Sequence, residues 1–276
     1  TANPTTTTTY TITGTDVNSC VNTTTSTVTV NPQFDATITP AGPYCQNNGT
    51  VTMTAVDAGG TWSSSCGACI NGASGSFDPA TASVGTNTIT YLIPGACGDT
   101  NTINVLVNPV PDVVATPATS TICSGQTTAI TLTGAVVGTV FDWTVSVTNV
   151  SGTSAGSGAT IAQTLTTPTP PTGTATYTIV PTASGCVGSP ATAVVTVEEV
   201  VINSINVTPA LCFGSNDGTI TINATGGTSY SIMGGAPGTL FPTNVFTVGA
   251  GIYSIVVTNA NGCSAAGTAT ITEPTV

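Results

Sequence analysis

Alternating hydrophobic and polar residues recur in short runs along the chain. Three clear runs are residues 50–54, 129–133 and 219–223, in which Val, Ile, Leu or Met alternates with Thr, Ala or Asn. A period of two residues places alternate side chains on opposite faces of a β-strand. Gly, Pro and Asn punctuate these runs as turn residues do, and we find no amphipathic helical pattern of useful length. We therefore expect an all-β fold.

The expected strands are organised in a repeat, which is the most informative feature of the sequence. Four segments carry a Tyr in an alternating strand and then a Cys in a turn: Tyr10 to Cys20, Tyr91 to Cys97, Tyr177 to Cys186 and Tyr253 to Cys263. Before the last three, a first Cys is followed by an aromatic residue: Cys45 by Trp62, Cys123 by Trp143 and Cys212 by Tyr230. The order Cys, aromatic, Tyr, Cys is typical of immunoglobulin-like sandwiches. The sequence thus predicts tandem immunoglobulin-like β-sandwich modules.

Module boundaries are expected at Asn31-Pro32, at Asn108-Pro109 and at Glu198-Glu199, each just after a closing strand. The predicted domains are the closing half of a preceding module and three complete modules, with the ranges 1–32, 33–109, 110–199 and 200–276. The first range holds only two expected strands, 5–15 and 23–30. A lone hairpin is marginal in water. We therefore expect missing strands to be supplied from upstream in a longer parent chain or by a neighbouring copy.

Nine cysteines at domain-like intervals in so β-rich a chain indicate disulfides in an oxidising compartment. The first Cys of each complete module precedes one strand, the second follows another, and we expect these two strands to run in opposite directions, so that both cysteines lie at one pole. This predicts three bonds: Cys45 with Cys97, Cys123 with Cys186, and Cys212 with Cys263. Each would contribute about 4 kcal/mol in the chain-entropy model. Cys20 is expected to be unpaired.

Cys66-Gly67-Ala68-Cys69 is a short motif with three interpretations. A redox role needs a helix N-terminus, and these residues lie in a Ser/Gly/Asn loop. A zinc site needs two further ligands, and the repeat explains the nearest cysteines better. We favour a disulfide between Cys66 and Cys69 that staples the loop.

Composition limits the chemistry. Charged residues make up 4% of the chain, Lys, Arg and His are absent, and the net charge is −11. A Ser or Thr nucleophile therefore has no usual activator, and no cation is present to neutralise a phosphate. We expect no catalytic residue, no cofactor, no metal site and no nucleic-acid partner. Because 39% of residues are hydrophobic, the chain should nevertheless fold.

Two further groups have competing interpretations. Trp62, Trp143 and Tyr230 could stack against sugars, but their recurrence at one place in the repeat favours core packing. Asn216-Asp217-Gly218 could bind calcium, but no Asp-x-Asp-x-Asp run exists. The tripeptide is a common turn sequence, so we favour a turn.

Several segments of the chain are similar to repeats of a known family of bacterial surface proteins. Residues 207–220 (VTPALCFGSNDGTI), with Gly226-Gly227 and the ending at residues 257–263 (VTNANGC), resemble the SprB-type repeat of Bacteroidota gliding-motility adhesins. Residues 110–199 are similar to PKD-like modules, and residues 59–62 with 77–81 are similar to immunoglobulin-like modules of the same proteins. The resemblance implies export, by the type IX system, and a role in adhesion, gliding or surface layers.

These observations predict an extracellular structural or adhesive stalk segment of a large cell-surface protein. The alternatives are a fibre or sheath subunit assembled by strand complementation, and an accessory carbohydrate-binding module of a secreted enzyme. The expected partners are neighbouring modules or copies of the same protein, with surface polysaccharide as a further candidate. No apolar run is long enough to insert into a membrane.

Overall fold

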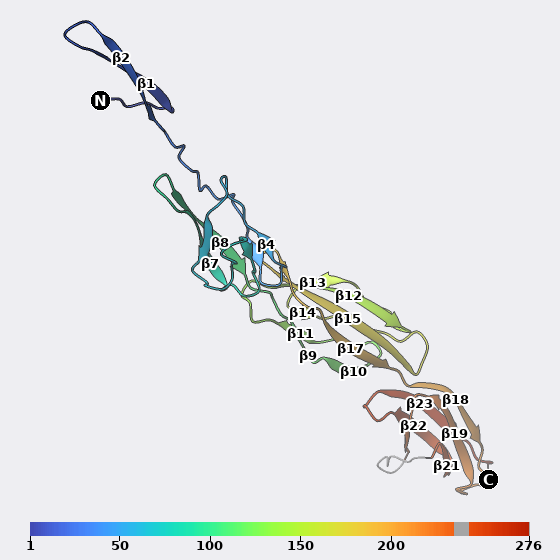
Figure 1. Ribbon diagram of the computed structural model, residues 1–276. Helices are drawn as coiled ribbons and strands as arrows, with labels where there is room; N and C mark the ends of the chain where they lie inside the picture. The colour runs from blue at the N-terminus through green and yellow to red at the C-terminus, as the bar shows by residue number, and fades with distance from the viewer. Residues whose placement is uncertain (235–242, 276) are drawn as a thin grey trace. The chain divides into compact units, whose positions relative to one another are not determined.

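The computed structural model describes residues 1–234 and 243–275, and within these ranges every regular element is a β-strand (Figure 1). The chain divides into two compact units, Thr1–Pro109 and Val110–Val276. The first unit contains one hydrophobic core and the second contains two. The predicted fold class, all-β with tandem immunoglobulin-like sandwiches, is confirmed.

The first unit begins with a two-stranded hairpin. Strands β1 (Thr8–Thr15) and β2 (Val21–Val28) pair antiparallel, with Thr8 opposite Val28 and Thr15 opposite Val21. Both strands are rich in Thr, which favours extended backbone. Their side chains stay open to solvent, Ile12 being 53% exposed and Val21 63%. The expected strand 5–15 is thus present in a shorter form, and the expected strand 23–30 is present at the same length but lies two residues earlier.

The first sandwich follows within the same unit. Its sheets are a four-stranded one, in the order β3-β8-β7-β5, and the pair β4-β6. Its strands are β3 (Tyr44–Cys45), β4 (Val51–Thr52), β5 (Thr61–Ser64), β6 (Ser76–Phe77), β7 (Gly85–Ile93) and β8 (Asp99–Asn108). Along β7, buried and exposed residues alternate as the sequence pattern predicts.

The core of the first sandwich is built on an aromatic pair. The rings of Trp62 and Tyr91 lie 4.4 Å apart between centroids. The Tyr91 hydroxyl donates to the carbonyl of Asp57 at 3.1 Å and accepts from the Gly60 amide at 2.8 Å, so its buried oxygen is satisfied. Other core residues include Ile89, Val105 and Val107, all 0% exposed.

The second sandwich opens the second unit. One sheet has the order β10-β17-β15-β12-β13, with β16 paired to β15, and the other has the order β14-β11-β9. The strands are β9 (Val114–Thr116), β10 (Thr119–Cys123), β11 (Ile130–Thr133), β12 (Val140–Thr148), β13 (Gly156–Ser157), β14 (Thr160–Ile161), β15 (Thr172–Ala183), β16 (Cys186–Val187) and β17 (Ala191–Glu198). Tyr177 is fully buried at its centre, and its hydroxyl bonds to Gln163 Oε1 at 2.8 Å.

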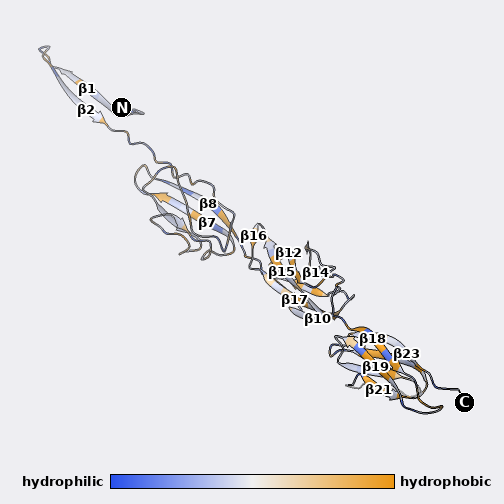
Figure 2. Ribbon diagram, turned by 90° about the vertical axis from the view of Figure 1, so that its right-hand side faces the viewer, coloured by the Kyte–Doolittle hydropathy of each residue, from blue (hydrophilic) through white to orange (hydrophobic). Residues whose placement is uncertain are grey.

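The third sandwich completes the second unit. It consists of two three-stranded sheets, β18-β19-β21 and β20-β22-β23. The strands are β18 (Val201–Thr208), β19 (Gly218–Thr225), β20 (Ser229–Met233), β21 (Val245–Val248), β22 (Gly251–Thr258) and β23 (Ser264–Ile271). Ile220, Ile222, Ile255 and Val257 form the centre of its core. Figure 2 shows hydrophobic residues along the strands of both sandwiches of this unit.

Candidate functional site

The cysteines differ from the predicted pairing. Cys123 is bonded to Cys263, so the predicted bonds of Cys123 with Cys186 and of Cys212 with Cys263 are wrong. Cys97 and Cys212 are free, as is Cys20, which was expected to be unpaired. Cys45 is disulfide-bonded, so the predicted bond with the free Cys97 is also wrong.

The remaining three predicted cysteines are all in disulfides. Cys66 and Cys69 are bonded to each other in the loop after β5, as predicted for a loop staple. Cys186 is buried and disulfide-bonded.

The pairing error has one physical cause, which is the direction of the strands. Strand β10 runs parallel to β17, and Cys123 lies opposite Glu198 at the end of β17. Cys186 lies before β17 begins, opposite Ala183 at the far end of β15. The two cysteines are therefore separated by the length of β15, roughly 35 Å for a strand of 12 residues.

The same arrangement recurs in the other two sandwiches. In the first, Cys45 lies opposite Asn108 at the end of β8, whereas Cys97 precedes the start of β8. In the third, the Ala210 amide donates to the carbonyl of Thr272, just past the end of β23, and this places the Cys212 loop there. Each module therefore has its first Cys at the pole where the chain leaves and its second Cys at the opposite pole.

The junction between the second and third sandwiches is where these two poles meet. Only Glu199 and Val200 separate β17 from β18. Val200 is 6% exposed and belongs to the third core, and Cys123 of the second sandwich packs against that same core. Cys263, 3% exposed, completes the disulfide from the turn between β22 and β23. A covalent bond and shared apolar packing thus connect the two sandwiches.

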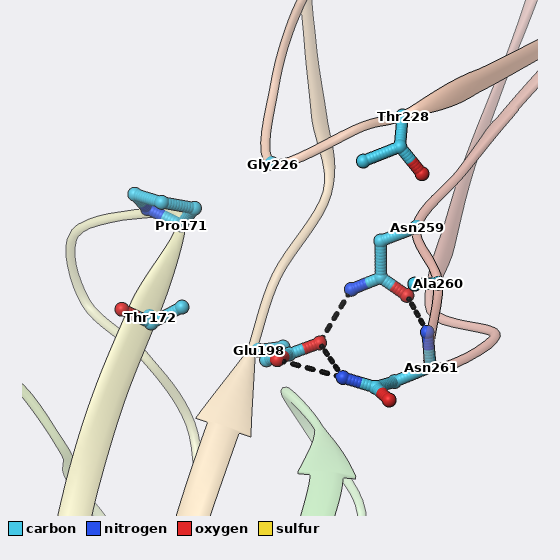
Figure 3. A pocket seen from close by; sticks show the side chains of 8 residues that line it. All are labelled: Pro171, Thr172, Glu198, Gly226, Thr228, Asn259, Ala260 and Asn261. Atoms are coloured by element: carbon cyan, nitrogen blue, oxygen red, sulfur yellow. Dashed lines mark hydrogen bonds between the residues drawn. The ribbon is translucent and has the colours of Figure 1, made fainter.

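A carboxylate makes the polar part of this junction (Figure 3). Glu198 Oε2 accepts a hydrogen bond from Asn259 Nδ2 at 2.6 Å, and both carboxylate oxygens accept from Asn261 Nδ2, at 2.9 and 3.0 Å. Hydrogen bonds to an ionised group are stronger than those between neutral groups. Since the chain has no Lys or Arg, side-chain amides take the place that a cation would fill in an ordinary ion pair.

Asn259 is fixed in place by its own turn. Its Oδ1 accepts from the backbone amides of Asn261 at 3.0 Å and Cys263 at 2.9 Å. The same side chain therefore shapes the turn that carries Cys263 and binds Glu198 with its Nδ2. Asn259 thus connects the turn that carries the disulfide to the group formed by Glu198, Asn259 and Asn261, which we call the Glu198 cluster.

The backbone packs closely at the same place. The Ser124 amide donates to the Glu198 carbonyl and the Glu199 amide to the Pro171 carbonyl, each at 2.8 Å. Gly226 has φ +81°, and a Cβ there would lie 2.3 Å from the Glu199 carbonyl oxygen. Only glycine fits both the left-handed backbone and this close approach.

A hollow of about 280 Å³ lies beside the cluster, lined by Pro171, Thr172, Glu198, Gly226, Thr228, Asn259, Ala260 and Asn261. Glu198 is the ionisable residue among these eight, and its carboxylate is already engaged by the two amides. The arrangement is suited to holding two modules together rather than to proton transfer.

The aromatic candidates lie in the cores. Trp62 and Trp143 are each 8% exposed, and Tyr230 packs against the third core. The Trp143 Nε1 donates to the Ser154 carbonyl at 3.2 Å, which satisfies its buried donor. The prediction of core packing is confirmed, and these three residues offer no platform for a sugar.

The turn predicted at Asn216-Asp217-Gly218 lies a few residues earlier, where the Ser215 amide donates to the Cys212 carbonyl, and Gly218 already begins β19; Asp217 stabilises that earlier turn. Its Oδ1 accepts from the Leu211 amide at 3.0 Å and from the Ser215 hydroxyl. The Ser215 hydrogen bond, followed by that from Leu211, lowers the pKa of Asp217 below its ordinary value. The side chain thus acts as a turn-forming residue. Within residues 1–234 and 243–275, no three His, Cys, Asp or Glu side chains gather as metal ligands would.

The contact of Glu198 with Asn259 and Asn261 was not predicted from the sequence. Glu198-Glu199 was interpreted only as a boundary, and the stretch ending at Cys263 only as part of a repeat. A signal was available in Asn259-x-Asn261-Gly262-Cys263, because an Asn side chain readily hydrogen-bonds the backbone two residues further on and so favours a turn. Its partner, 61 residues earlier, could not be identified from spacing.

The chain was compared with solved structures and with curated proteins. Among solved structures, the chain is similar to Sidekick-1 immunoglobulin domains 1–5, at 10% sequence identity and a TM-score of 0.33. This match covers 89% of this chain and 60% of that one. It is also similar to Protocadherin Gamma B2 extracellular cadherin domains 3–6, at 10% sequence identity and a TM-score of 0.30. This match covers 97% of this chain and 83% of that one. The chain therefore spans about 60% of the Sidekick-1 fragment. No curated protein matches it.

Two family models match within the second unit, and both confirm the resemblance predicted for these segments. Residues 120–200 match the PKD-like domain and residues 204–236 match the SprB repeat. These matches support an extracellular repeat module of the adhesion type. In the described residues, no helix has the length and apolar character needed to cross a bilayer. The second unit thus contains a segment similar to the PKD-like domain, followed by a segment similar to the SprB repeat.

Proposed function

We propose that this chain is a load-bearing stalk segment of a large, repetitive cell-surface protein. The observation that carries the proposal is the Cys123–Cys263 disulfide between successive sandwiches. Tension that enters the second unit near Cys123 passes through the sulfur bridge to Cys263 and on to β23. The residues between the two cysteines carry little of that load, so they stay folded under tension.

The other junction contacts suit the same role. The Glu198 cluster, the buried Val200 and the close approach at Gly226 restrict rotation of one sandwich against the next. Restricted junctions keep an array of modules extended, as a spacer requires. We propose 1–32, 33–109, 110–199 and 200–276 as the successive segments of this stalk.

The SprB and PKD-like matches support a surface location and an adhesion-type parent protein. On that ground we propose gliding motility and type IX export as the setting. The described residues offer no exposed aromatic platform at the predicted positions, so no observation favours a carbohydrate-binding role.

Single-molecule pulling of the 276-residue chain from its two ends tests the load-bearing role. The two cysteines are 140 residues apart, and an extended chain spans about 3.5 Å per residue. Opening of this bond should therefore let reduced chains release about 490 Å more contour length than oxidised chains. Equal lengths before and after reduction would show that the disulfide bears no load, and the proposal would fail.

A further inference from the structure

The free thiol of Cys212 lies in an ordered turn at the exit pole of the third sandwich. The Cys212 amide donates to Ser215 Oγ at 3.3 Å, and the Ser215 amide donates back to the Cys212 carbonyl at 3.1 Å. The thiol is exposed, and its neighbours Leu211 and Phe213 are 77% and 63% exposed. Two large apolar side chains and a thiol thus point outward from a fixed loop.

The second sandwich carries the same turn in a bonded state. The Cys123 amide donates to Gln126 Oε1 at 3.0 Å, and the Gln126 amide donates back to the Cys123 carbonyl at 3.0 Å. Cys123 also lies at the exit pole, and it is bonded to Cys263 of the next sandwich. The bond at Cys123 therefore shows that a cysteine in this turn and at this pole can join its module to the next one.

The other half of that bond is also repeated. In the turn that carries Cys263, Asn259 Oδ1 accepts from the Cys263 amide at 2.9 Å, and the Asn259 amide donates to the Cys263 carbonyl at 2.9 Å. In the hairpin turn, Asp16 Oδ1 accepts from the Cys20 amide at 2.9 Å, and the Asp16 amide donates to the Cys20 carbonyl at 3.0 Å.

Further details of the two turns agree. The Asx oxygen accepts a second amide, from Asn18 at 2.8 Å in one and from Asn261 at 3.0 Å in the other. The residue before each Cys has a left-handed backbone, with φ 64° at Ser19 and 87° at Gly262. Cys20 is exposed and free. The backbone turn that holds Cys20 is therefore the same as the turn that holds Cys263 in its bond with Cys123.

We infer that Cys212 of one copy of this chain forms a disulfide with Cys20 of a second copy, so that copies join head to tail. The oxidant is a low-molecular-weight disulfide. The Cys212 thiolate attacks one of its sulfurs, releasing one thiolate and leaving a mixed disulfide. The Cys20 thiolate then attacks Cys212 Sγ, forms the protein disulfide and releases the second thiolate. Two cysteine thiols are oxidised and one small disulfide is reduced to two thiols.

Cys97 stays outside this bond. It is also free, but the backbone hydrogen bonds of its turn are Gly98 amide to Gly95 carbonyl and Phe34 amide to Cys97 carbonyl, which are not those of the Cys263 turn. The inference goes beyond a stalk within one chain, because it supplies a covalent link between chains that repeats the observed junction.

Oxidation of the purified 276-residue chain with glutathione disulfide tests the link. Non-reducing electrophoresis should show a ladder of covalent multimers, and peptic peptide mapping should identify Cys212–Cys20 as the main new bond. Pepsin is suitable because its acidic medium suppresses disulfide exchange and the chain has no Lys or Arg for trypsin. The single variants Cys212→Ser and Cys20→Ser should each abolish the ladder, whereas Cys97→Ser should leave it unchanged.

Three outcomes would overturn the inference. The first is the absence of multimers, and the second is an even mixture of Cys212–Cys212, Cys212–Cys97 and Cys212–Cys20 bonds. The third is found in protein taken from its native surface, if Cys212 is bonded there to a cysteine that belongs to no copy of these 276 residues. Because Cys212 is a free thiol and takes no part in the Cys123–Cys263 bond, Cys212→Ser should not alter the pulling experiment. Failure of the inter-chain bond is therefore distinguishable from failure of the stalk function.

Discussion

Removing the disulfide at the junction should destabilise the third sandwich much more than the second. The change is the double variant Cys123→Ala/Cys263→Ala, which leaves no new thiol. While the second sandwich is folded, the Ser124 amide stays on the Glu198 carbonyl, so Cys123 remains beside the start of the linker. The disulfide then closes an unfolded loop that runs only from residue 198 to residue 263, about 65 residues, and this contributes about 4 kcal/mol in the chain-entropy model.

Packing adds a smaller contribution. Cys263 is 3% exposed, so truncating it to Ala costs roughly another 1 kcal/mol. A loss of about 4 to 5 kcal/mol in a domain of this size lowers its melting temperature by roughly 20 °C. Scanning calorimetry of the whole chain should show one transition moving by this amount.

The matched control is Cys212→Ala, which removes an exposed, free thiol from the same sandwich and should leave the transition in place. A loss of no more than about 1 kcal/mol in the double variant would show that packing alone accounts for the effect. The view that the disulfide restrains the third sandwich would then be refuted.

Three further changes probe the junction and the loop beside it. Gly226→Ala should lower the free energy of unfolding, measured by chemical denaturation, by at least about 2 kcal/mol more than Gly262→Ala does. Both glycines have positive φ, but only a Cβ at residue 226 would meet backbone atoms, so equal losses would contradict the close approach. A double-mutant cycle of Glu198→Ala with Asn261→Ala should give a coupling energy of about 1 kcal/mol, and additive losses would mean that their hydrogen bonds contribute nothing. The pKa of Asp217 is lower in the folded loop than its ordinary value. The Asp217 carboxylate should therefore stabilise the fold at pH values above the ordinary carboxyl pKa, and this stabilisation should disappear as pH falls through the lowered pKa. Amide NMR should record this change, Asp217→Asn should abolish it, and a titration at the ordinary value would contradict the hydrogen bonds.

The strands and core residues could be predicted because they depend on local pattern. Alternation along β7 and β15 identifies the buried face directly, and the aromatic positions Trp62 and Trp143 follow from their place in the repeat. The direction of a strand cannot be predicted in this way, because alternation with a period of two residues looks the same whichever way the strand runs in the sheet. The parallel pairing of β10 with β17 determines the pole at which Cys123 lies, and no local signal encodes it.

Contacts between modules were the second kind of feature that sequence reasoning missed. The Glu198 cluster joins residues on two sandwiches, and the repeat favours pairing within a module because each module contains two cysteines. The bond of Cys123 to Cys263 spans 140 residues and is decided by which poles meet at the linker. The same repeat, once its poles are known, supports the pairing that we infer for the Cys20 and Cys212 turns.

The proposed stalk function requires the second and third sandwiches to behave as one rigid segment. Residual dipolar couplings of backbone amides in the oxidised 276-residue chain test it most directly. The account predicts that amides of β15 and β17 share a single alignment tensor with those of β22 and β23, and that the Cys123→Ala/Cys263→Ala variant carrying Glu198→Ala needs two. Two distinct tensors in the oxidised chain without these substitutions would contradict the claim.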